Sequence, residues 1–254
     1  GGDALVLMPT GGGKSLCYQL PALLREGTAL VVSPLIALMQ DQVAQLSQMG
    51  IPSALLNSSL SPPEQSQVMR GARQGKYRLL DLSPERLARP DTVEMLAESD
   101  VSLMAIDEAH CVSQWGHDFR PEYLTLGSLA RQIGGRLQTM ALTATADAPT
   151  RGDIVDKLFA DPPRTFVRSF DRPNLRLAFK PKERSSKQVL AFVKSHDGES
   201  GIVYCASRRK VEELAETLKK EGVNALPYHA GLDKSARDAN LDRFQQEDGV
   251  VMTA

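Results

Sequence analysis

A glycine-rich turn between a strand and a helix is the feature that most restricts how this chain folds. The apolar run Ala4–Met8 predicts a strand, and Pro9-Thr10-Gly11-Gly12-Gly13-Lys14-Ser15 follows it directly. Glycines let successive backbone N–H groups converge on phosphate oxygens, and the positive end of a following helix adds to that attraction. With a helix expected from about Ser15, the arrangement predicts a phosphate-binding loop in an α/β domain.

The predicted nucleotide contacts are the residues of this loop: Thr10, Gly11, Gly12, Gly13, Lys14 and Ser15. Lys14 can reach the β- and γ-phosphates, and the Ser15 hydroxyl can ligate Mg²⁺. Met8 stands where the strict P-loop pattern has glycine, so the generic motif is not met in full. The alternative interpretation is a flexible glycine turn that holds no ligand.

A second group of polar residues follows another apolar run. Val101–Ile106 predicts a strand, and it ends in Asp107-Glu108-Ala109-His110. Ligands of open α/β sheets bind at the carboxyl ends of strands, so Asp107 is placed to hold Mg²⁺ directly or through water. Glu108 can orient and deprotonate an attacking water, which favours hydrolysis over transfer to another acceptor. His110 either relays the state of the γ-phosphate to a neighbouring domain or satisfies a local hydrogen bond.

Short β-rich runs alternate with amphipathic helical segments along the chain. The predicted strands are Ala4–Met8, Ala29–Val32, Leu79–Leu82, Val101–Ile106, Leu137–Leu142 and Gly201–Cys205. Residues 210–221 predict a helix, since their apolar positions recur at i, i+3, i+4 and i+7. Ser61-Pro62-Pro63-Glu64 has the pattern of a capping box with proline at the first helical position. This alternation predicts a parallel sheet with helices on both faces.

The chain is expected to contain two units. One α/β unit is complete by about Ser169, and the polar residues 180–187 have the composition of a solvated linker. A new alternation of strands and helices follows this linker. We therefore assign residues 1–168 to a first domain and residues 169–254 to the start of a second.

Composition limits the class of protein. Apolar residues make up 42% of the 254 residues and charged residues 24%, which excludes a disordered or collagen-like chain. No apolar run approaches the roughly 20 residues of a membrane-spanning helix. The cysteines Cys17, Cys111 and Cys205 lack CxxC spacing, so we expect a reducing cytoplasm and neither disulfides nor a zinc site. The net charge of −1 does not by itself indicate a nucleic-acid partner.

Two stretches together resemble the RecQ family of DNA helicases, which belongs to superfamily 2. They are Met8-Pro-Thr-Gly-Gly-Gly-Lys-Ser-Leu-Cys-Tyr-Gln19 and Asp107-Glu-Ala-His-Cys-Val-Ser-Gln-Trp-Gly-His-Asp-Phe-Arg-Pro-Glu-Tyr123. The first stretch alone indicates only a P-loop ATPase close to the helicases, whereas the second is highly specific. Methionine at position 8 is acceptable in that family, and the resemblance covers essentially the whole chain.

Further segments match the family's motifs in order. Those that resemble its strand-contacting motifs are Ser33–Gln42, Asn57-Ser58 and Ser83–Arg86. Ala141–Ala146 resembles the motif that couples hydrolysis to DNA binding. The segments that resemble the second RecA-like domain are Phe170–Asn174, Val203–Arg208 and Tyr228–Leu232.

The resemblance implies a RecA-like P-loop domain with a parallel sheet, followed by an incomplete second RecA-like domain. It implies ATP-driven 3′–5′ translocation on single-stranded DNA and duplex unwinding in DNA repair and recombination, with ATP and Mg²⁺ as cofactors. The implied partners are single-stranded and forked DNA and no membrane, in the bacterial cytoplasm or nucleoid. The implied catalytic residues are Lys14, Asp107, Glu108 and His110, with Ser15 and Asp107 on Mg²⁺. The implied DNA-binding or coupling residues are Ser33, Gln114, Trp115, His117, Phe119, Arg120, Thr143, Thr145, Ser207 and Arg208.

The segment Ser113–Tyr123 has the chemistry of a single-strand contact. Phosphate contacts and aromatic stacking together hold single strands, and Trp115, Phe119 and Arg120 lie close together in a chain that is only 5% aromatic. The segment directly follows the acidic pair, so it is placed to sense both the bases and the nucleotide. The alternatives are a core position for Trp115, which is the only tryptophan, and a solvated Arg120.

Hydroxyl groups at strand ends are the other candidate contacts. Thr143 and Thr145 can exchange hydrogen-bond partners between the acidic motif and the second domain, although threonines at a strand end are also ordinary β-strand residues. Ser33 and Ser207 are each expected at the carboxyl end of a strand, where a hydroxyl and a backbone N–H can hold a DNA phosphate. Arg208 adds charge there, or belongs to a solvated helix start.

Three alternative functions remain open at this point. The first is an RNA helicase or another superfamily 2 translocase, because backbone contacts dominate the binding of single strands. The second is a P-loop kinase, which Glu108 and the second domain disfavour. The third is a nucleotide-binding or regulatory module without motor activity, against which the intact Lys14, Asp107 and Glu108 argue.

The chain also departs from the family pattern. The family's upstream adenine-recognition element, its arginine finger and its zinc-binding and winged-helix regions are expected to lie outside these residues, so no zinc is expected here. Asp81 stands where the family has an apolar or aromatic residue, and we interpret it as a tolerated strand-edge position.

An arginine finger raises the rate of phosphoryl transfer roughly 10³–10⁵-fold in related phosphoryl-transfer sites. We therefore expect residues 1–254 alone to bind MgATP weakly and to unwind no DNA, which a strand-displacement assay on this chain checks. Robust ATP-driven unwinding by this chain alone would contradict that expectation.

Overall fold

The computed structural model describes residues 2–116, 118–134, 137–169 and 174–254. His117 and the Phe170–Pro173 part of the expected domain start therefore lie outside the described residues. The chain divides into two compact units, Gly1–Pro173 and Asn174–Ala254, and each is described by itself. The expected domain division at Ser169 remains a prediction.

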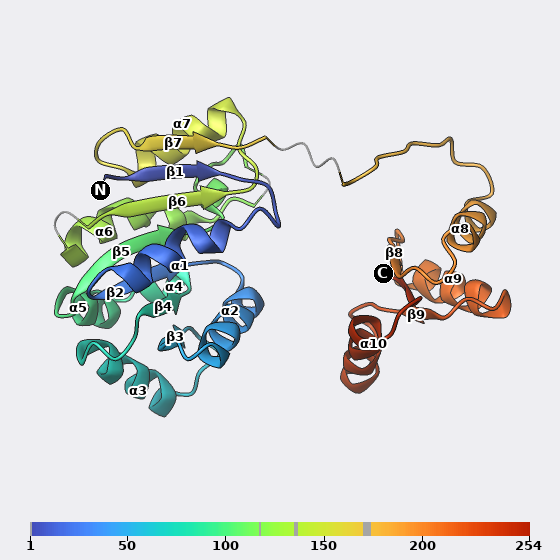
Figure 1. Cartoon of the computed structure of the whole chain (residues 1–254), viewed down its shortest axis with the longest axis horizontal. Coiled ribbons are helices and arrows are strands. Elements are labelled where there is room, and N and C mark those ends of the chain that lie inside the picture. Colours follow the sequence, from blue (N-terminus) through green and yellow to red (C-terminus); the bar gives the residue numbers. More distant parts are fainter. Residues whose placement is uncertain (1, 117, 135–136, 170–173) are drawn as a thin grey trace. The chain divides into compact units, whose positions relative to one another are not determined.

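The first unit is built on one sheet of seven strands (Figure 1). In chain order they are β1 Ala4–Leu7, β2 Thr28–Val32, β3 Ser53–Leu56, β4 Leu79–Leu82, β5 Val101–Ile106, β6 Thr139–Thr143 and β7 Arg164–Val167. They lie in the order β3-β4-β2-β5-β6-β1-β7, and every neighbouring pair is parallel. The prediction of a parallel α/β sheet is confirmed, and β3 and β7 are strands that the apolar runs did not indicate.

Helices cover both faces of this sheet. They are α1 Lys14–Leu24, α2 Ile36–Gln48, α3 Pro62–Arg73, α4 Pro84–Leu87, α5 Pro90–Ala97, α6 Leu126–Gly134 and α7 Ala148–Leu158, with 3₁₀ turns η1 Ala109–Val112 and η2 Pro121–Thr125. Helices α1 and α2 bury Tyr18 and Leu46 against one face, and α3, α5, α6 and α7 form a second apolar cluster on the other. No helix within the described ranges has the length and apolar character needed to cross a bilayer.

Local sequence signals explain where several elements begin. Helix α3 begins with the predicted capping box, in which the Ser61 N–H and hydroxyl both donate to Glu64 Oε2, at 2.8 and 2.6 Å. Strand β6 begins at Thr139 and not at Leu137. The Thr139 N–H donates to the Asp3 carboxylate at 2.8 Å, so this hydrogen bond holds the start of β6 beside the start of β1.

The second unit is a three-stranded parallel sheet in the order β8-β10-β9. Its elements are α8 Ser185–Lys194, β8 Gly201–Val203, α9 Arg208–Lys220, β9 Ala225–Pro227, α10 Lys234–Gln246 and β10 Val251–Thr253. Helix α9 buries Val211, Ala215 and Leu218, which is the apolar face that the spacing predicts. Strand β8 ends at Val203, two residues earlier than expected, which changes the setting of Ser207 as described below.

Asp81 is not at an edge of the sheet, contrary to the sequence interpretation. Strand β4 lies between β3 and β2, and Asp81 pairs in register with Leu55 and Val31. Its side chain is 1% exposed, and Oδ2 has no hydrogen-bond partner within the described residues. Burial, and secondarily the charge of Asp107, raises the pKa of the Asp81 carboxyl to about 8.

This raised pKa predicts how the stability of the protein depends on pH. In the unfolded chain Asp81 releases its proton near pH 4, whereas in the folded chain it keeps the proton up to about pH 8. The folded state therefore binds more protons between these values, and the free energy of unfolding falls as the pH rises from about 4 to 8. Asp81→Leu removes the group, so at pH 8 we expect a gain of about 1–3 kcal/mol over the wild type, shrinking toward pH 4.

Chemical unfolding at several pH values measures this gain. The exposed carboxyl of Asp156 on α7 provides the control. An Asp156→Leu variant with the same pH-dependent gain, or an Asp81→Leu variant with none, would contradict the explanation.

Candidate functional site

The predicted site residues of the first unit gather at the carboxyl edge of its sheet. The phosphate loop follows β1, Ser33 follows β2, Asp107 follows β5, and Thr143 ends β6. Because the strands are parallel, all of these ends lie at one edge (Figure 1). The sheet therefore brings together groups that are up to 133 residues apart, the separation of Thr10 from Thr143.

The loop after β1 has the backbone of a phosphate cradle. Gly11 and Gly13 have φ of 76° and 83°, a region that favours glycine. A Cβ on Gly12 would lie 2.9 Å from the Pro9 carbonyl oxygen, so this position has no room for a side chain. Helix α1 begins at Lys14, and no side chain among the described residues caps it. The Leu16 N–H donates to the Gly13 carbonyl at 3.1 Å, so Lys14 and Ser15 offer the remaining first-turn N–H groups to an anion.

The acidic pair is held next to this loop. The Asp107 N–H donates to the Val32 carbonyl at 2.8 Å, and the Glu108 N–H donates to Asp107 Oδ1 at 3.0 Å. Burial, followed by the charge of Glu108, raises the pKa of Asp107 to about 6, while that N–H and Lys14 act in the opposite direction. Glu108 has φ of 48°, the left-handed region that non-glycine residues rarely adopt. Such strain is typical of functional sites.

His110 connects the acidic pair to the end of β6. Its Nδ1 lies 2.9 Å from Thr143 Oγ1 and 3.3 Å from Glu108 Oε2. The Thr143 hydroxyl donates to the Thr145 carbonyl at 3.1 Å, so it accepts from His110, and the carboxylate also only accepts. Both contacts assign the proton to Nδ1. The local hydrogen bond that the sequence allowed for His110 is therefore present.

The segment after the acidic pair presents its tryptophan to solvent. Trp115 is 77% exposed, which excludes the core position. The backbone N–H of Trp115 donates to Ser113 Oγ at 3.2 Å, and that hydroxyl donates to Asp153 Oδ2 on α7 at 2.6 Å. A Cβ on Gly116 would lie 2.8 Å from the His110 carbonyl oxygen, so the turn beside Trp115 requires glycine. The exposed indole therefore stands on a well-anchored turn.

Tyr123 closes this segment back onto the acidic pair. Its side chain is fully buried, and its hydroxyl donates to the Asp107 carbonyl at 2.9 Å. Arg120, which was expected either to contact a ligand or to be solvated, is half-buried and forms an ion pair with Asp118 at 3.1 Å. Tyr123 was not selected from the sequence, although it is the last residue of the matched stretch, because its role depends on a contact across 16 residues.

A groove of about 630 Å³ lies at the same edge of the sheet. Its lining comes from the segments that follow β2, β3, β4 and β5, and includes Asn57, Arg86, Arg89 and Arg120. Asn57 Nδ2 and Arg86 Nε and Nη1 are buried and have no hydrogen-bond partner in the described part of the chain. Arg86 Nη2 pairs with Asp91 at 3.3 Å, so only part of this guanidinium is satisfied, and buried donors without partners are rare.

The other predicted residues of the first unit differ in exposure. Ser33 is buried, with its N–H donating to the Leu82 carbonyl at 3.2 Å. Thr10, Gln114 and Thr145 are exposed, whereas Lys14, Ser15 and Phe119 are half-buried.

Ser207 and Arg208 belong to the second unit. Ser207 does not end a strand, because β8 ends at Val203; its hydroxyl caps α9 by accepting from the Lys210 N–H at 3.4 Å. Arg208 is the exposed first residue of that helix, as the alternative of a solvated helix start proposed.

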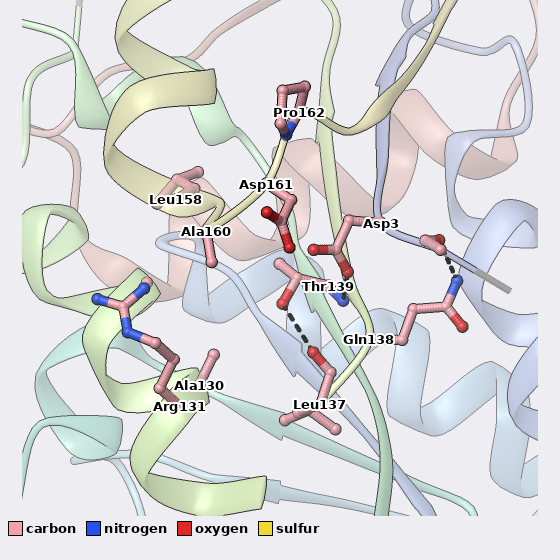
Figure 2. A pocket seen from close by; sticks show the side chains of 12 residues that line it. Asp3, Ala130, Arg131, Leu137, Gln138, Thr139, Leu158, Ala160, Asp161 and Pro162 are labelled. Carbon is pink, nitrogen blue, oxygen red and sulfur yellow. Dashed lines mark hydrogen bonds between the residues drawn. The ribbon is translucent and has the colours of Figure 1, made fainter. Parts of the chain in front are cut away.

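A different pocket, of about 420 Å³, lies at the opposite, amino edge of the large sheet (Figure 2). Its polar lining is largely engaged: Asp3 accepts from the Thr139 N–H, and Gln138 Nε2 donates to the Gly2 carbonyl at 2.6 Å. None of the predicted site residues lines it.

A parallel sheet with a phosphate loop after one strand and an acidic pair after another defines a P-loop nucleotide-binding domain. Residues 1–153 match the DEAD/DEAH box helicase family, and residues 182–254 match the helicase conserved C-terminal domain. The chain therefore belongs to the DEAD/DEAH box helicase family. Membership in this family implies ATP binding.

Known proteins are similar in sequence to this chain over all or nearly all of its length. The chain is 49% identical, over all its residues, to the ATP-dependent DNA helicase RecQ of Pasteurella multocida, and covers 40% of that protein. It is 42% identical to RecQ of Bacillus subtilis, with 98% of the chain and 42% of the relative covered. It is 43% identical to the RecQ-like DNA helicase BLM of Xenopus laevis, with all of the chain and 19% of the relative covered. The resemblance to RecQ helicases is confirmed, and the chain spans about two fifths of the bacterial RecQ relatives.

Solved structures share the fold. The DUF1998 helicase MrfA bound to DNA and AMPPNP matches with a TM-score of 0.72 at 23% identity, covering all of this chain and 39% of that one. S. cerevisiae Dbp5 bound to RNA and ADP BeF3 matches with a TM-score of 0.66 at 15% identity. This match covers 99% of the present chain and 65% of the Dbp5 chain. The predicted RecA-like P-loop domain followed by a smaller parallel-sheet unit is confirmed.

Proposed function

We propose that this chain is the ATP-hydrolysing and strand-contacting part of a RecQ-type DNA helicase that moves 3′ to 5′ on single-stranded DNA and unwinds duplexes. The observation that carries the proposal is the anchoring of Trp115. The exposed indole stands on a segment that begins at the acidic pair and returns to it through the Tyr123–Asp107 hydrogen bond. One short segment thus serves both a nucleotide and a strand.

The phosphate loop and the acidic pair supply the chemistry of hydrolysis. The N–H groups of the loop and the Lys14 ammonium bind the phosphates of ATP. The Ser15 hydroxyl and the Asp107 carboxylate are hard oxygen ligands that fit Mg²⁺, which when bound neutralises charge on the phosphates. Glu108 orients the attacking water and accepts its proton. Its contact with His110 keeps the carboxylate in a fixed position.

His110 and Thr143 carry the state of the nucleotide site away from it. Movement of Glu108 changes the hydrogen bond from His110 Nδ1, and therefore the partners of the Thr143 hydroxyl at the end of β6. Thr145, which is bound to that hydroxyl through its backbone N–H at 3.2 Å, moves with it. We propose that Thr145 contacts the strand, as do Ser207 and Arg208 of residues 169–254.

The groove beside Asn57 and Arg86 receives the sugar–phosphate backbone. Phosphate oxygens can accept from the Asn57 amide and from Arg86, Arg89 and Arg120, whose guanidinium groups are shared with Asp91 and Asp118. Ser33 lies at the start of the Pro34–Ile36 wall of this groove. The bases then stack on Trp115 and Phe119, as single strands do on aromatic side chains.

DNA is the favoured substrate over RNA. The RecQ relatives named as DNA helicases are 42–49% identical to this chain, whereas the RNA-bound Dbp5 is 15% identical and shares the fold alone. A kinase is disfavoured by the match of residues 182–254 to a helicase C-terminal domain. We propose single-stranded and forked DNA as partners and the bacterial cytoplasm or nucleoid as the location, from the bacterial relatives.

The Trp115→Ala variant tests the coupling. In the full-length protein we expect basal ATP turnover to remain and stimulation by single-stranded DNA to fall at least about fivefold, because one stacking contact is lost. Lys14→Ala should abolish both the basal ATP turnover and its stimulation by DNA. Leu124→Ala, which removes an exposed apolar side chain just beyond the segment, should change neither. Unchanged DNA stimulation in Trp115→Ala would refute the coupling role.

The Arg86→Met variant tests the groove. We expect about tenfold weaker binding of single-stranded DNA, and a slope of log affinity against log salt reduced by about 0.7, the value for one phosphate contact. Fluorescence anisotropy at several salt concentrations measures both. Arg73→Met is the control, since Arg73 pairs with Glu98 at the end of α3 and does not line the groove.

Arg86 is buried, so Arg89→Met provides a second variant with an exposed side chain in the same groove. If both variants bind DNA with the affinity and salt slope of the wild type, the strand does not lie in this groove.

A further inference from the structure

Helix α2 makes a side-chain contact with the phosphate loop that the proposed mechanism does not use. The Gln42 Nε2 amide donates to the Ser15 hydroxyl oxygen at 3.3 Å. The Tyr18 hydroxyl donates to Gln42 Oε1 at 2.8 Å. Ser15 and Tyr18 are one turn apart on α1, whereas Gln42 lies on α2, 27 residues beyond Ser15. The three side chains form one chain of hydrogen bonds between the two helices.

Packing fixes the far end of this chain. Tyr18 is 1% exposed and belongs to the apolar cluster that joins Ala22 of α1 and Leu46 of α2 to the sheet. Burial raises the pKa of Tyr18 well above its ordinary value, so the hydroxyl keeps its proton and donates at neutral pH. This packing holds the ring, and the hydrogen bond to Gln42 Oε1 directs its O–H bond.

The direction of each bond determines what reaches Ser15. Because the Tyr18 hydroxyl occupies the oxygen of the Gln42 amide, the NH₂ group of that amide faces the loop. A hydroxyl oxygen has two lone pairs, and an amide NH₂ can only donate. Gln42 therefore occupies one lone pair of Ser15 Oγ, and the second lone pair remains for a cation. The Tyr18 hydroxyl also interacts with the Ser15 side chain, so Gln42 and Tyr18 together limit the staggered rotamers that the Ser15 hydroxyl samples.

We infer that Gln42 is a positioning residue for the Ser15 hydroxyl, and that Tyr18 holds Gln42 in the orientation that this requires. The inference rests on the proposed role of Ser15 toward the Mg²⁺ that accompanies the nucleotide. It makes α2 a structural part of the nucleotide site. The same helix begins just after Ser33-Pro34-Leu35, the segment proposed to contact the strand.

Calorimetric titration of the full-length protein with ADP, with and without Mg²⁺, tests the inference without measuring turnover. The quantity of interest is the gain in ADP affinity that Mg²⁺ provides. We expect Gln42→Met to reduce this gain about tenfold, as removal of a group that orients a metal ligand typically does. Its affinity for ADP without Mg²⁺ should equal that of the wild type. Tyr18→Phe should reduce the gain a few-fold, through one lost hydrogen bond.

A double-mutant cycle separates positioning of Ser15 from a general structural effect. In a Ser15→Ala background, Gln42→Met should not reduce the Mg²⁺-dependent gain in ADP affinity any further, because the hydroxyl that Gln42 positions is gone. Gln45→Met provides the matched control, as Gln45 is an exposed glutamine on the same helix. If Gln42→Met fails to fold, Gln42→Leu, which also removes the amide, gives the same comparison in the two backgrounds.

Two results would overturn the inference and leave the role of Ser15 intact. One is a Gln42→Met variant that gains as much ADP affinity from Mg²⁺ as the wild type. The other is a Gln42→Met substitution that reduces this gain equally in the wild-type and Ser15→Ala backgrounds. A different result is that Mg²⁺ does not change the ADP affinity of the wild type and that the Ser15→Ala variant behaves identically. That result would overturn the proposed metal site, and the positioning role of Gln42 with it.

Discussion

The parallel pairing of β1, β6 and β5 determines where the phosphate loop, the acidic pair and Thr143 lie. Strand β6 is hydrogen-bonded to β1 on one side and to β5 on the other, all in the same direction. Its last residue, Thr143, is therefore next to both the phosphate loop and the acidic pair. The Met8 N–H donates to the Thr143 carbonyl at 3.2 Å, and the Thr143 hydroxyl binds His110. An antiparallel β6 would place this threonine at the opposite edge.

The site departs from the most stable local arrangement in several places. Glu108 has a left-handed backbone, and Asp107 and Asp81 are carboxyls with raised pKa values. Arg86 has two buried donors, Nε and Nη1, that find no partner among the described residues. Such departures concentrate at functional sites, where a ligand completes the interactions. The surrounding sheet, with helices on both faces, supplies the stability that tolerates them. Asp81 is different, since no proposed ligand reaches it.

Sequence patterns predicted the groups that act through their own chemistry, and less well those that act through contacts. The apolar runs predicted β1, β2, β4 and β5 because these strands are largely buried, whereas β7 is exposed at every position and gave no signal. Lys14, Asp107 and Trp115 were identified because residue type and position specify their roles. Gln42 and Tyr123 lie within matched stretches, but their importance depends on partners 27 and 16 residues away, which no local spacing encodes.

The central claim is that one edge of one sheet binds both a nucleotide and a DNA strand, so that each ligand changes the affinity for the other. The most direct test is the affinity of the full-length protein for single-stranded DNA with and without a saturating non-hydrolysable ATP analogue, and the reciprocal titration of the analogue. We expect the analogue to change the DNA affinity at least about fivefold. We expect DNA to change the affinity for the analogue by the same factor, as linkage requires of coupled sites. Equal DNA affinities in the presence and absence of the analogue would contradict the claim.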